Sequence, residues 1–138
     1  MSEEEWRAFV AEGTRTGKVA TTRPDGRPHV APVWFVLDGA DLVFTTGRNT
    51  AKGRALTADP RVAICVDDER PPFSFVLIEG TATVSEEPAA LLDAAIKLGA
   101  RYMGADRAEE FGRRNAVPGE LLIRVHPDKV IAQAELSG

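Results

Sequence analysis

The fold of this chain is decided by residues 18–46, KVATTRPDGRPHVAPVWFVLDGADLVFTT. The stretch contains three runs rich in β-branched and aromatic residues, separated by two turns that contain Asp-Gly. Asp-Gly between apolar runs favours tight hairpin turns, so the pattern predicts a meander of three antiparallel strands. Pro32 lies inside the second run, 29–37, and predicts an edge, a bulge or a kink in that strand.

Further elements are predicted on both sides of this stretch. Ser2 and Glu5 form a capping-box pattern that predicts a short helix over 2–12. The later segments are a short helix at 51–59, strands at 61–67 and 73–85 with a bulge at Gly80, a helical insertion at about 86–116, and strands at 120–125 and 129–136. Residues 1–138 are therefore expected to form one domain, mostly β with flanking helices, as a closed or split antiparallel barrel.

Composition excludes several classes of protein. The formal net charge of −4 argues against a nucleic-acid binder, which needs a strong basic surface. Cys65 is the only cysteine, so no internal disulfide can form, and its apolar neighbours predict a buried, inert thiol. The N-terminus has no signal-peptide pattern, and no apolar run is long enough to cross a bilayer. We therefore expect a cytoplasmic protein without membrane insertion.

A polar turn after the third run is the first candidate site. It brings hydroxyl, amide and cationic groups to the start of the helix at 51–59, from Thr45, Thr46, Arg48, Asn49, Thr50 and Lys52. Because a helix N-terminus offers free N–H groups and a partial positive charge, these residues could hold a phosphate. The alternative is a capped surface helix with a solvated lysine.

Side chains for acid, base or nucleophilic catalysis are few. The only histidines are His29 and His126, and no nucleophile-elbow, zinc-protease or phosphate-loop motif is present. No metal site is expected either. His29 could bond across its hairpin or contact a ligand, and Arg23 and Arg27, which bracket the first turn, are expected to be solvated. Any chemistry is therefore expected to come from a cofactor.

The order of motifs resembles one family. V-A-T-x-x-P-D-G-x-P from residue 19, followed by A-K-x-x-x-L-x-x-D-P-R-V from residue 51, is similar to the pyridoxamine 5′-phosphate oxidase-like superfamily. Within it, the chain resembles the actinobacterial flavin/deazaflavin oxidoreductases that use coenzyme F420. The resemblance covers most of residues 15–130 and is weakest over 86–116. It implies an FMN-binding type of split barrel that forms a homodimer, with cofactor sites at the subunit interface.

The resemblance also implies which residues contact the cofactor. The ring would lie along the second strand, and the phosphate end at the polar turn, with Lys52 as the phosphate-binding lysine. The fifth strand, near Phe75, would approach the ring edge. The implied contacts are Val30, Ala31, Pro32, Val33, Trp34, Thr45, Thr46, Arg48, Asn49, Thr50, Ala51, Lys52 and Phe75.

Two departures favour one cofactor over another. The vitamin B6 oxidases carry cations on the second strand, which here reads VAPVWF, and an arginine where this chain has Ala51. Fewer cations for an FMN phosphate favour F420, whose polyglutamyl tail needs basic groups such as Arg48, Arg54, Lys18 and Arg15. We expect hydride transfer between reduced F420 and an unsaturated small organic substrate, with a proton from water or His29. An FMN-dependent oxidoreductase and a non-catalytic F420 or flavin carrier are the alternatives.

Overall fold

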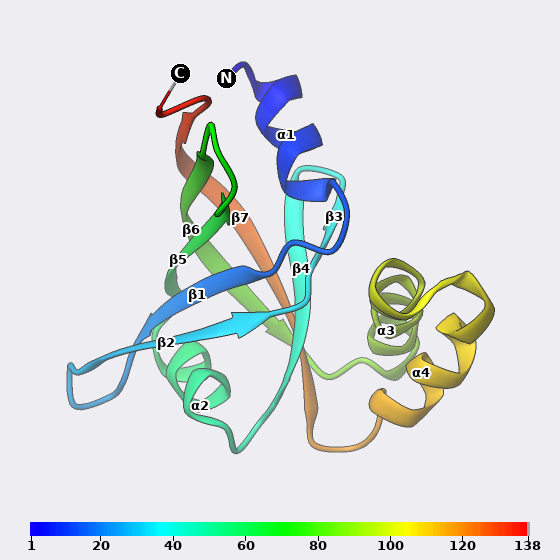
Figure 1. The fold of residues 1–138 in the computed structure, drawn as a ribbon. Coiled ribbons are helices and arrows are strands. Elements are labelled where there is room, and N and C mark those ends of the chain that lie inside the picture. Colours follow the sequence, from blue (N-terminus) through cyan, green and yellow to red (C-terminus); the bar gives the residue numbers. More distant parts are fainter. Residues whose placement is uncertain (138) are drawn as a thin grey trace.

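A computed structural model describes residues 1–137 as a seven-stranded antiparallel sheet with four α-helices. The helices are α1 (Glu3–Ala11), α2 (Ala51–Ala58), α3 (Pro88–Met103) and α4 (Ala108–Asn115), with a 3-10 turn, η1, over Ala105–Arg107. The strands are β1 (Gly17–Thr22), β2 (Pro28–Val33), β3 (Val36–Asp38), β4 (Asp41–Gly47), β5 (Arg61–Asp68), β6 (Ser74–Ser85) and β7 (Glu120–Gln133). They follow the order β2-β1-β5-β6-β7-β4-β3 and curl into a split barrel (Figure 1), which confirms the predicted fold class.

The barrel is split where the sequence predicts one continuous strand over 29–37. That prediction is wrong, because β2 ends at Val33 and β3 begins at Val36 on the opposite edge of the sheet. Phe35, in the link, is fully buried, so the chain leaves the strand to place this ring in the core. The predicted meander is replaced by two separate hairpins, β1–β2 and β3–β4. β2 is an edge strand, one of the outcomes predicted from Pro32, and its register with β1 is unbroken.

The two strands predicted at the C-terminus are a single strand, β7. His126, Pro127 and Asp128 do not form a turn; they make a bulge opposite β6, where the register shifts between Glu79 and Gly80. A Cβ atom on Gly80 would lie 2.5 Å from the His126 carbonyl oxygen, so only glycine allows the strands to approach this closely. The bulge predicted at Gly80 is therefore confirmed.

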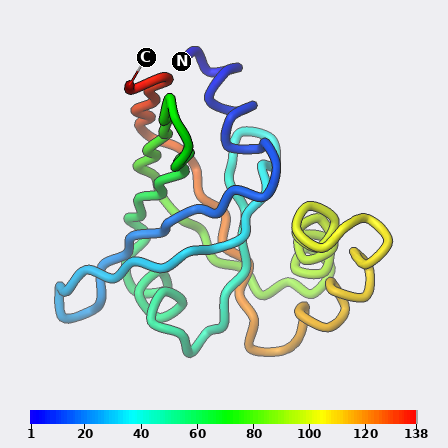
Figure 2. Tube along the Cα trace, viewed as in Figure 1, coloured from blue at the N-terminus to red at the C-terminus, as the bar shows by residue number. Residues whose placement is uncertain are grey.

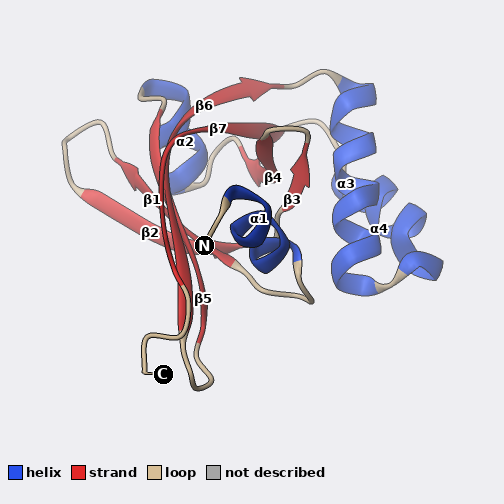
Figure 3. Cartoon of the chain, turned by 90° about the horizontal axis from the view of Figure 1, so that it is seen from above, coloured by secondary structure: helices blue, strands red, loops and turns tan. Residues whose placement is uncertain are grey.

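The core fills the barrel interior and is closed at one end by α1. Phe35, Phe44 and Ile123 are fully buried, and Trp6 and Val10 of α1 join the same cluster. The predicted capping box is present, since Ser2 accepts from the Glu5 N–H and the Glu5 carboxylate accepts from the Ser2 N–H. A second, smaller cluster joins α3 to β4 and β7, and Figure 3 shows α3 and α4 outside the barrel on one side.

The arrangement places the two ends of the barrel far apart. The N- and C-terminal segments lie at one end, whereas the β1–β2 hairpin tip projects beside α2 toward the other (Figure 2). Among residues 1–137, no helix is both long and apolar enough to cross a membrane. The hairpin tip and α2 therefore face each other at the end of the molecule that α1 leaves open.

Candidate functional site

The first turn of α2 is fixed by the Thr50 side chain, which caps the helix. Its hydroxyl donates to the Gly47 carbonyl (2.8 Å), accepts from the Gly53 N–H (3.1 Å) and lies 3.0 Å from the Thr46 hydroxyl. A hydroxyl has one proton, which Thr50 uses on Gly47, so Thr46 must be the donor between the two threonines. The hydroxyl of Thr50 is thus fully used by the cap, and the turn leaves the first N–H groups and Lys52 for a ligand.

Thr45 faces away from this capping network. Side chains alternate along β4, where Thr46 is buried toward the interior and Thr45 is half-buried on the other face. On that face, burial raises the pKa of Glu120, opposed by a hydrogen bond from Thr45 and by the positive charge of Lys52. No sequence pattern indicates Glu120 as a site residue, because it reaches this group only through the pairing of β7 with β4, which places Glu120 opposite Gly47.

The exposed residues of the turn point toward the helical insertion or to solvent. Arg48 forms an ion pair with Glu86, which lies two residues before the start of α3, and its N–H donates to the Gly119 carbonyl (2.8 Å). Asn49 is exposed. Neither contact brings these two side chains to the group formed by Thr46, Thr50 and Gly53.

Strand β2 places its predicted contact residues on two different faces. Val30 is 65% exposed and shares the outward face with Pro32, whereas Ala31 and Val33 face inward. Pro28 and Pro32 have no N–H, so they cannot exchange two backbone hydrogen bonds with their partners on β1. They therefore occupy the non-hydrogen-bonded positions of this strand pair, as does Val30 between them. The carbonyls of these three residues and the Val30 N–H point to the free edge of the sheet. The edge thus offers one N–H, from Val30, between several carbonyl oxygens.

The end of β2 is held by the helical insertion. The Trp34 ring stacks on the Tyr102 ring with centroids 4.8 Å apart and planes 4° apart. The Tyr102 hydroxyl donates to the Arg15 carbonyl (2.7 Å) and accepts from the Phe35 N–H (3.2 Å), and burial raises its pKa. One face of Trp34 is therefore already occupied, and α3 determines where β2 ends.

Arg101 adds a second connection at the same place. Its guanidinium donates to the carbonyls of Val10 (2.7 Å), Gly13 (2.9 Å) and Phe35 (2.6 Å). α3 is thereby joined both to the end of α1 and to the link between the two edges of the barrel. No local sequence pattern indicates this connection, because it depends on contacts between residues 66 to 91 positions apart.

The β1–β2 hairpin carries buried polar side-chain atoms that have no hydrogen-bond partner within the part of the chain that the structure describes, residues 1–137. These are Thr21 Oγ1, Arg23 Nε and His29 Nδ1. Thr21 and His29 are register partners, so their side chains lie on the same face of the hairpin. Native proteins leave few such atoms unpaired, which makes this hairpin unusual within the molecule. His29 therefore faces away from Val30 and Pro32.

Beside these atoms, the hairpin tip and α2 enclose a hollow of about 470 Å³. It is lined by Arg23, Pro24, Asp25, Arg27, Ala51 and Arg54. Arg27 pairs with Asp25 at 2.8 Å, and the charged residues that line the hollow are thus three arginines and one aspartate. The expectation that Arg23 and Arg27 are simply solvated is wrong for Arg23, whose Nε is buried.

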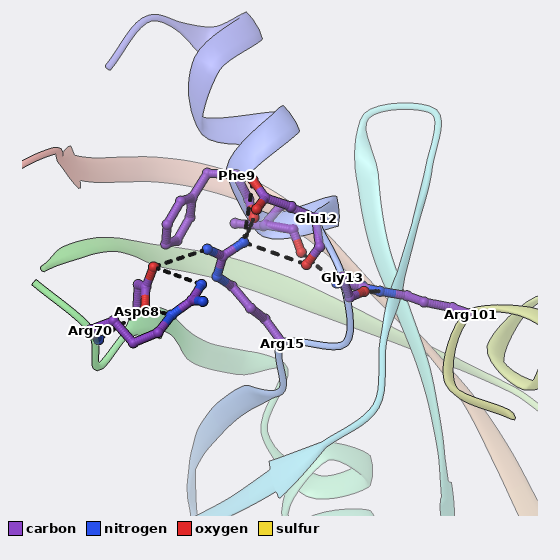
Figure 4. Close-up of polar contacts among 8 residues, drawn as sticks. Phe9, Glu12, Gly13, Arg15, Asp68, Arg70 and Arg101 are labelled. Atoms are coloured by element: carbon purple, nitrogen blue, oxygen red, sulfur yellow. Dashed lines mark hydrogen bonds and ion pairs between the residues drawn. The ribbon is translucent and has the colours of Figure 1, made fainter.

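Two other cations that could serve an anionic tail are already engaged. Arg15 lies 4.1 Å from the Phe9 ring centroid, donates to the Phe9 carbonyl (3.0 Å) and pairs with Asp68 at 3.3 Å (Figure 4). Lys18 pairs with Asp67 at 2.9 Å. Of the four tail candidates, Arg54 alone has no ion pair among residues 1–137.

Phe75 does not join the group around β2 and α2 within one chain. It lies on β6, the sixth strand, because the split of residues 29–37 adds one strand to the predicted count. β1 and β5 separate it from β2, which is about 14 Å at ordinary strand spacing. The site that one chain presents is therefore the β2 edge, the first turn of α2 and the arginine-lined hollow.

This group has binding capacity and little catalytic capacity of its own. Among residues 1–137, no cluster of three or more His, Cys, Asp or Glu side chains could share a metal ion. The β2 edge provides a peptide N–H and carbonyls beside apolar side chains, and α2 provides cations. Such an arrangement can hold a planar polar ring with an anionic extension.

Comparisons with known proteins agree with this architecture. The sequence model of the pyridoxamine 5′-phosphate oxidase family matches residues 2–134. A conserved hypothetical protein from Mycobacterium tuberculosis is 28% identical, with a TM-score of 0.87, over 99% of this chain and 87% of that one. An F420 reductase is 30% identical, with a TM-score of 0.69, over 90% of this chain and 94% of that one. The heme storage protein HutZ from Vibrio cholerae is 19% identical, with a TM-score of 0.77, over 99% of this chain and 98% of that one. At this identity the likeness is one of fold alone. This chain belongs to the pyridoxamine 5′-phosphate oxidase family.

Proposed function

We propose that this protein is an oxidoreductase that uses coenzyme F420 to reduce an unsaturated small organic substrate. The observation that carries the proposal is the contrast between β2 and α2. The outward side chains of β2 are apolar and include no cation, whereas Lys52 and Arg54 near the start of α2 form no ion pair with the carboxylates of residues 1–137. The similarity to an F420 reductase at 30% identity supports this choice.

The β2 edge fits the ring of a deazaflavin. The pyrimidine side of such a ring carries carbonyl acceptors and an N–H donor, so the Val30 N–H can donate to one ring carbonyl and a neighbouring backbone carbonyl can accept from the ring N–H. Val30 and Pro32 present apolar surface beside that edge. The backbone would hold the ring without a charged side chain, which suits a strand that has none.

The start of α2 fits the phosphate of the cofactor. The first N–H groups of a helix have no partner within the helix, and the partial positive charge there favours an anion. Lys52 adds a full charge, and the Thr46–Thr50–Gly53 network holds the turn rigid. The hydroxyl of Thr50 is used by the cap, so in this proposal it positions the turn.

The chemistry itself is supplied by the cofactor, since reduced F420 when bound carries the hydride that is transferred. The residues of this chain orient the ring through the β2 peptide, anchor the phosphate at Lys52 and keep one ring face open to substrate. His29 lies on the inner face of the hairpin, away from Val30. We therefore assign the proton that completes the reduction to water.

We also propose that two copies form a homodimer through the outer face of the sheet. One row across this face contains Pro32, Lys18, Cys65, Leu77 and Ile131, which the strand registers align. Ile131 is 37% exposed in the single chain. Cys65 is half-buried on this face and not in the core, and burial raises the pKa of its thiol. A second copy there would supply the Phe75 that one chain keeps away from its own β2.

The test is a titration of the purified protein with F420 and with FMN. Micromolar binding of F420, followed by turnover of enones, quinones or nitroaromatics in the presence of reduced F420, is the expected result. FMN binding without F420 binding, or a protein that is yellow as purified, would instead identify an FMN-dependent enzyme. Tight F420 binding with no turnover across that panel would identify a carrier.

A further inference from the structure

A separate pocket lies on the side of the barrel that α3 covers (Figure 3), where the ends of β4 and β7 meet the start of that helix. This α3 pocket has a volume of about 380 Å³ and is lined by Arg48, Glu86, Pro88, Leu91 and residues 116–120. It shares no lining residue with the arginine-lined hollow. The strand order also places β2 at the opposite edge of the sheet from β4 and β3, so the α3 pocket is distinct from the proposed ring site.

The walls of the α3 pocket are mainly apolar. Leu91 belongs to the second hydrophobic cluster, and Ala116 packs against that cluster. Val117, in the loop after α4, is 45% exposed. Pro88 and Pro118 have no N–H, so they add no backbone donor. Walls of this kind, around a volume within the usual range of small-molecule sites, fit the hydrocarbon body of a ligand.

Most polar groups around the α3 pocket already have partners. Arg48 forms an ion pair with Glu86, and its backbone N–H donates to the Gly119 carbonyl (2.8 Å). The carboxylate of Glu87 caps the start of α3, because it accepts from the N–H groups of residues 89 (3.1 Å) and 90 (2.7 Å). Neither the guanidinium nor the helix start is therefore left to attract an anion.

The Glu120 carboxyl differs from these groups. It forms no ion pair among residues 1–137, although it lines the pocket next to the paired Arg48 and Glu86. Burial raises the pKa of Glu120, and a hydrogen bond from Thr45 and the charge of Lys52 oppose that rise. A carboxylate that has lost part of its water gains more from a charged donor than an exposed carboxylate does.

We infer that the α3 pocket binds a small organic cation, with its ammonium group at Glu120 and its apolar body against Leu91 and Val117. An anion is disfavoured, because the lining has two carboxyl groups and one guanidinium. A neutral molecule of the same shape would fill the pocket but leave Glu120 without a counter-charge. The inference goes beyond the proposed oxidoreductase activity and does not depend on the cofactor.

The experiment compares two probes that share one apolar ring. Benzylamine is a cation at neutral pH, whereas benzyl alcohol has no charge. Each is titrated into the wild type and into Glu120→Gln, and binding is followed through the backbone amide signals in NMR spectra. Gln keeps the shape of the side chain and an acceptor for Thr45. Glu110→Gln, at an exposed position of α4, is the charge-matched control.

We expect benzylamine to shift the signals of residues 117 and 119–120 and of the first turn of α3, with a Kd of about 1 mM for so small a probe. Glu120→Gln should weaken benzylamine binding about 5- to 30-fold and leave benzyl alcohol binding unchanged. The wild type should bind benzyl alcohol more weakly than benzylamine, and Glu110→Gln should match the wild type with both probes.

A second variant tests the position of the site if Glu120→Gln does not fold. Val117→Trp enlarges a lining residue that is 45% exposed, so the larger ring can fill the pocket without entering the core. We expect this variant to lose the shifts that both probes cause at residues 119–120 and at the start of α3.

Equal affinity of the wild type for the two probes would overturn the inference, because the pocket would then not select a cation. So would unchanged benzylamine affinity in Glu120→Gln, an equal loss in Glu110→Gln, or shifts that survive Val117→Trp. None of these measurements involves F420, so failure of this inference is distinguishable from failure of the proposed function.

Discussion

Strand β1 has an arginine cluster at each end, and the two clusters differ in what satisfies them. Before β1, Arg15 and Arg70 share the Asp68 carboxylate, and Arg15 also donates to the backbone of α1 (Figure 4). After β1, Arg23 has a buried Nε without an acceptor among residues 1–137, and Asp25 is the one acidic residue in the lining of the hollow beside it. The first cluster closes the barrel against α1, whereas the second leaves donors that a ligand can use.

The comparison shows how structural and binding arginines can be separated within one chain. A guanidinium that already has its carboxylate and carbonyl acceptors has little to gain from a ligand. A guanidinium with a buried unpaired N–H gains an acceptor without losing one.

The largest expected effect concerns the proposed association of two copies through the outer face of the sheet. Val30→Asp places a charge on the outward face of β2, where Val30 is 65% exposed in the single chain. We expect a dimeric wild type and a monomeric variant, measured as molar mass by light scattering, because a buried unpaired charge opposes association. Val117→Asp, at a residue 45% exposed away from this face, should remain dimeric. A monomeric wild type would contradict the proposed assembly.

Lys52→Ala removes the unpaired charge in the first turn of α2. We expect F420 binding to weaken by about 1–3 kcal/mol, as for a charge-assisted contact to phosphate. Titration by ring fluorescence measures the effect, and thermal unfolding should show no loss of stability. Lys97→Ala on α3, where the lysine pairs with Asp93, should bind as the wild type does. Unchanged F420 affinity in Lys52→Ala would mean that the turn is only the capped start of a helix and does not bind the phosphate.

Thr50→Ala tests the network that holds the same turn. The variant loses the cap on the Gly53 N–H and leaves the Thr46 hydroxyl without its acceptor. We expect a loss of about 1 kcal/mol in the free energy of unfolding, measured by urea denaturation. Thr50→Ser keeps the hydroxyl and should recover most of that loss. A Ser variant as unstable as the Ala variant would point to the lost methyl group instead.

The smallest expected effect concerns the arginine cluster before β1, in which Arg15 and Arg70 pair with Asp68. The backbone N–H of Arg70, followed by its guanidinium, lowers the pKa of Asp68 from 3.8 to about 2. A depressed pKa gives stability that is present above about pH 4 and is lost as the pH falls through 2. Asp68→Asn should therefore have a lower Tm at pH 7 and a flatter loss of Tm between pH 4 and 2. Asp106→Asn, on η1, is the control for the change in net charge. An acid profile identical to wild type would mean that Asp68 does not carry this stability.

Local patterns were enough to predict most elements of the fold, but not how two of them are interrupted. Asp-Gly turns and alternating apolar residues predicted the hairpins, and Gly80 predicted its bulge. The run from Val33 to Leu37 is apolar whether the strand continues or crosses the barrel, so the split depends on the burial of Phe35. His126-Pro127-Asp128 has the composition of a turn, and only the partner strand makes it a bulge.

In the candidate site, too, some features follow from local sequence and others depend on residues far apart in the chain. The cap at Thr50 and the lysine two residues after it can be read from neighbouring residues. The hollow cannot, because it forms only when the hairpin tip reaches α2 and brings Arg23 beside Arg54. Glu120 likewise enters through strand pairing with Gly47. Residues far apart in the sequence therefore decide the charge balance of the site.

The two prolines of β2 have a consequence for the behaviour of this protein at high concentration. An exposed strand edge normally recruits another strand, because each unpaired N–H can meet a carbonyl of a neighbouring chain. With prolines at 28 and 32, the edge of β2 retains a single N–H between them and cannot template a continuous ladder. Growth of fibres by edge-to-edge addition at β2 is blocked, while the edge stays accessible to a ligand small enough to need only one N–H.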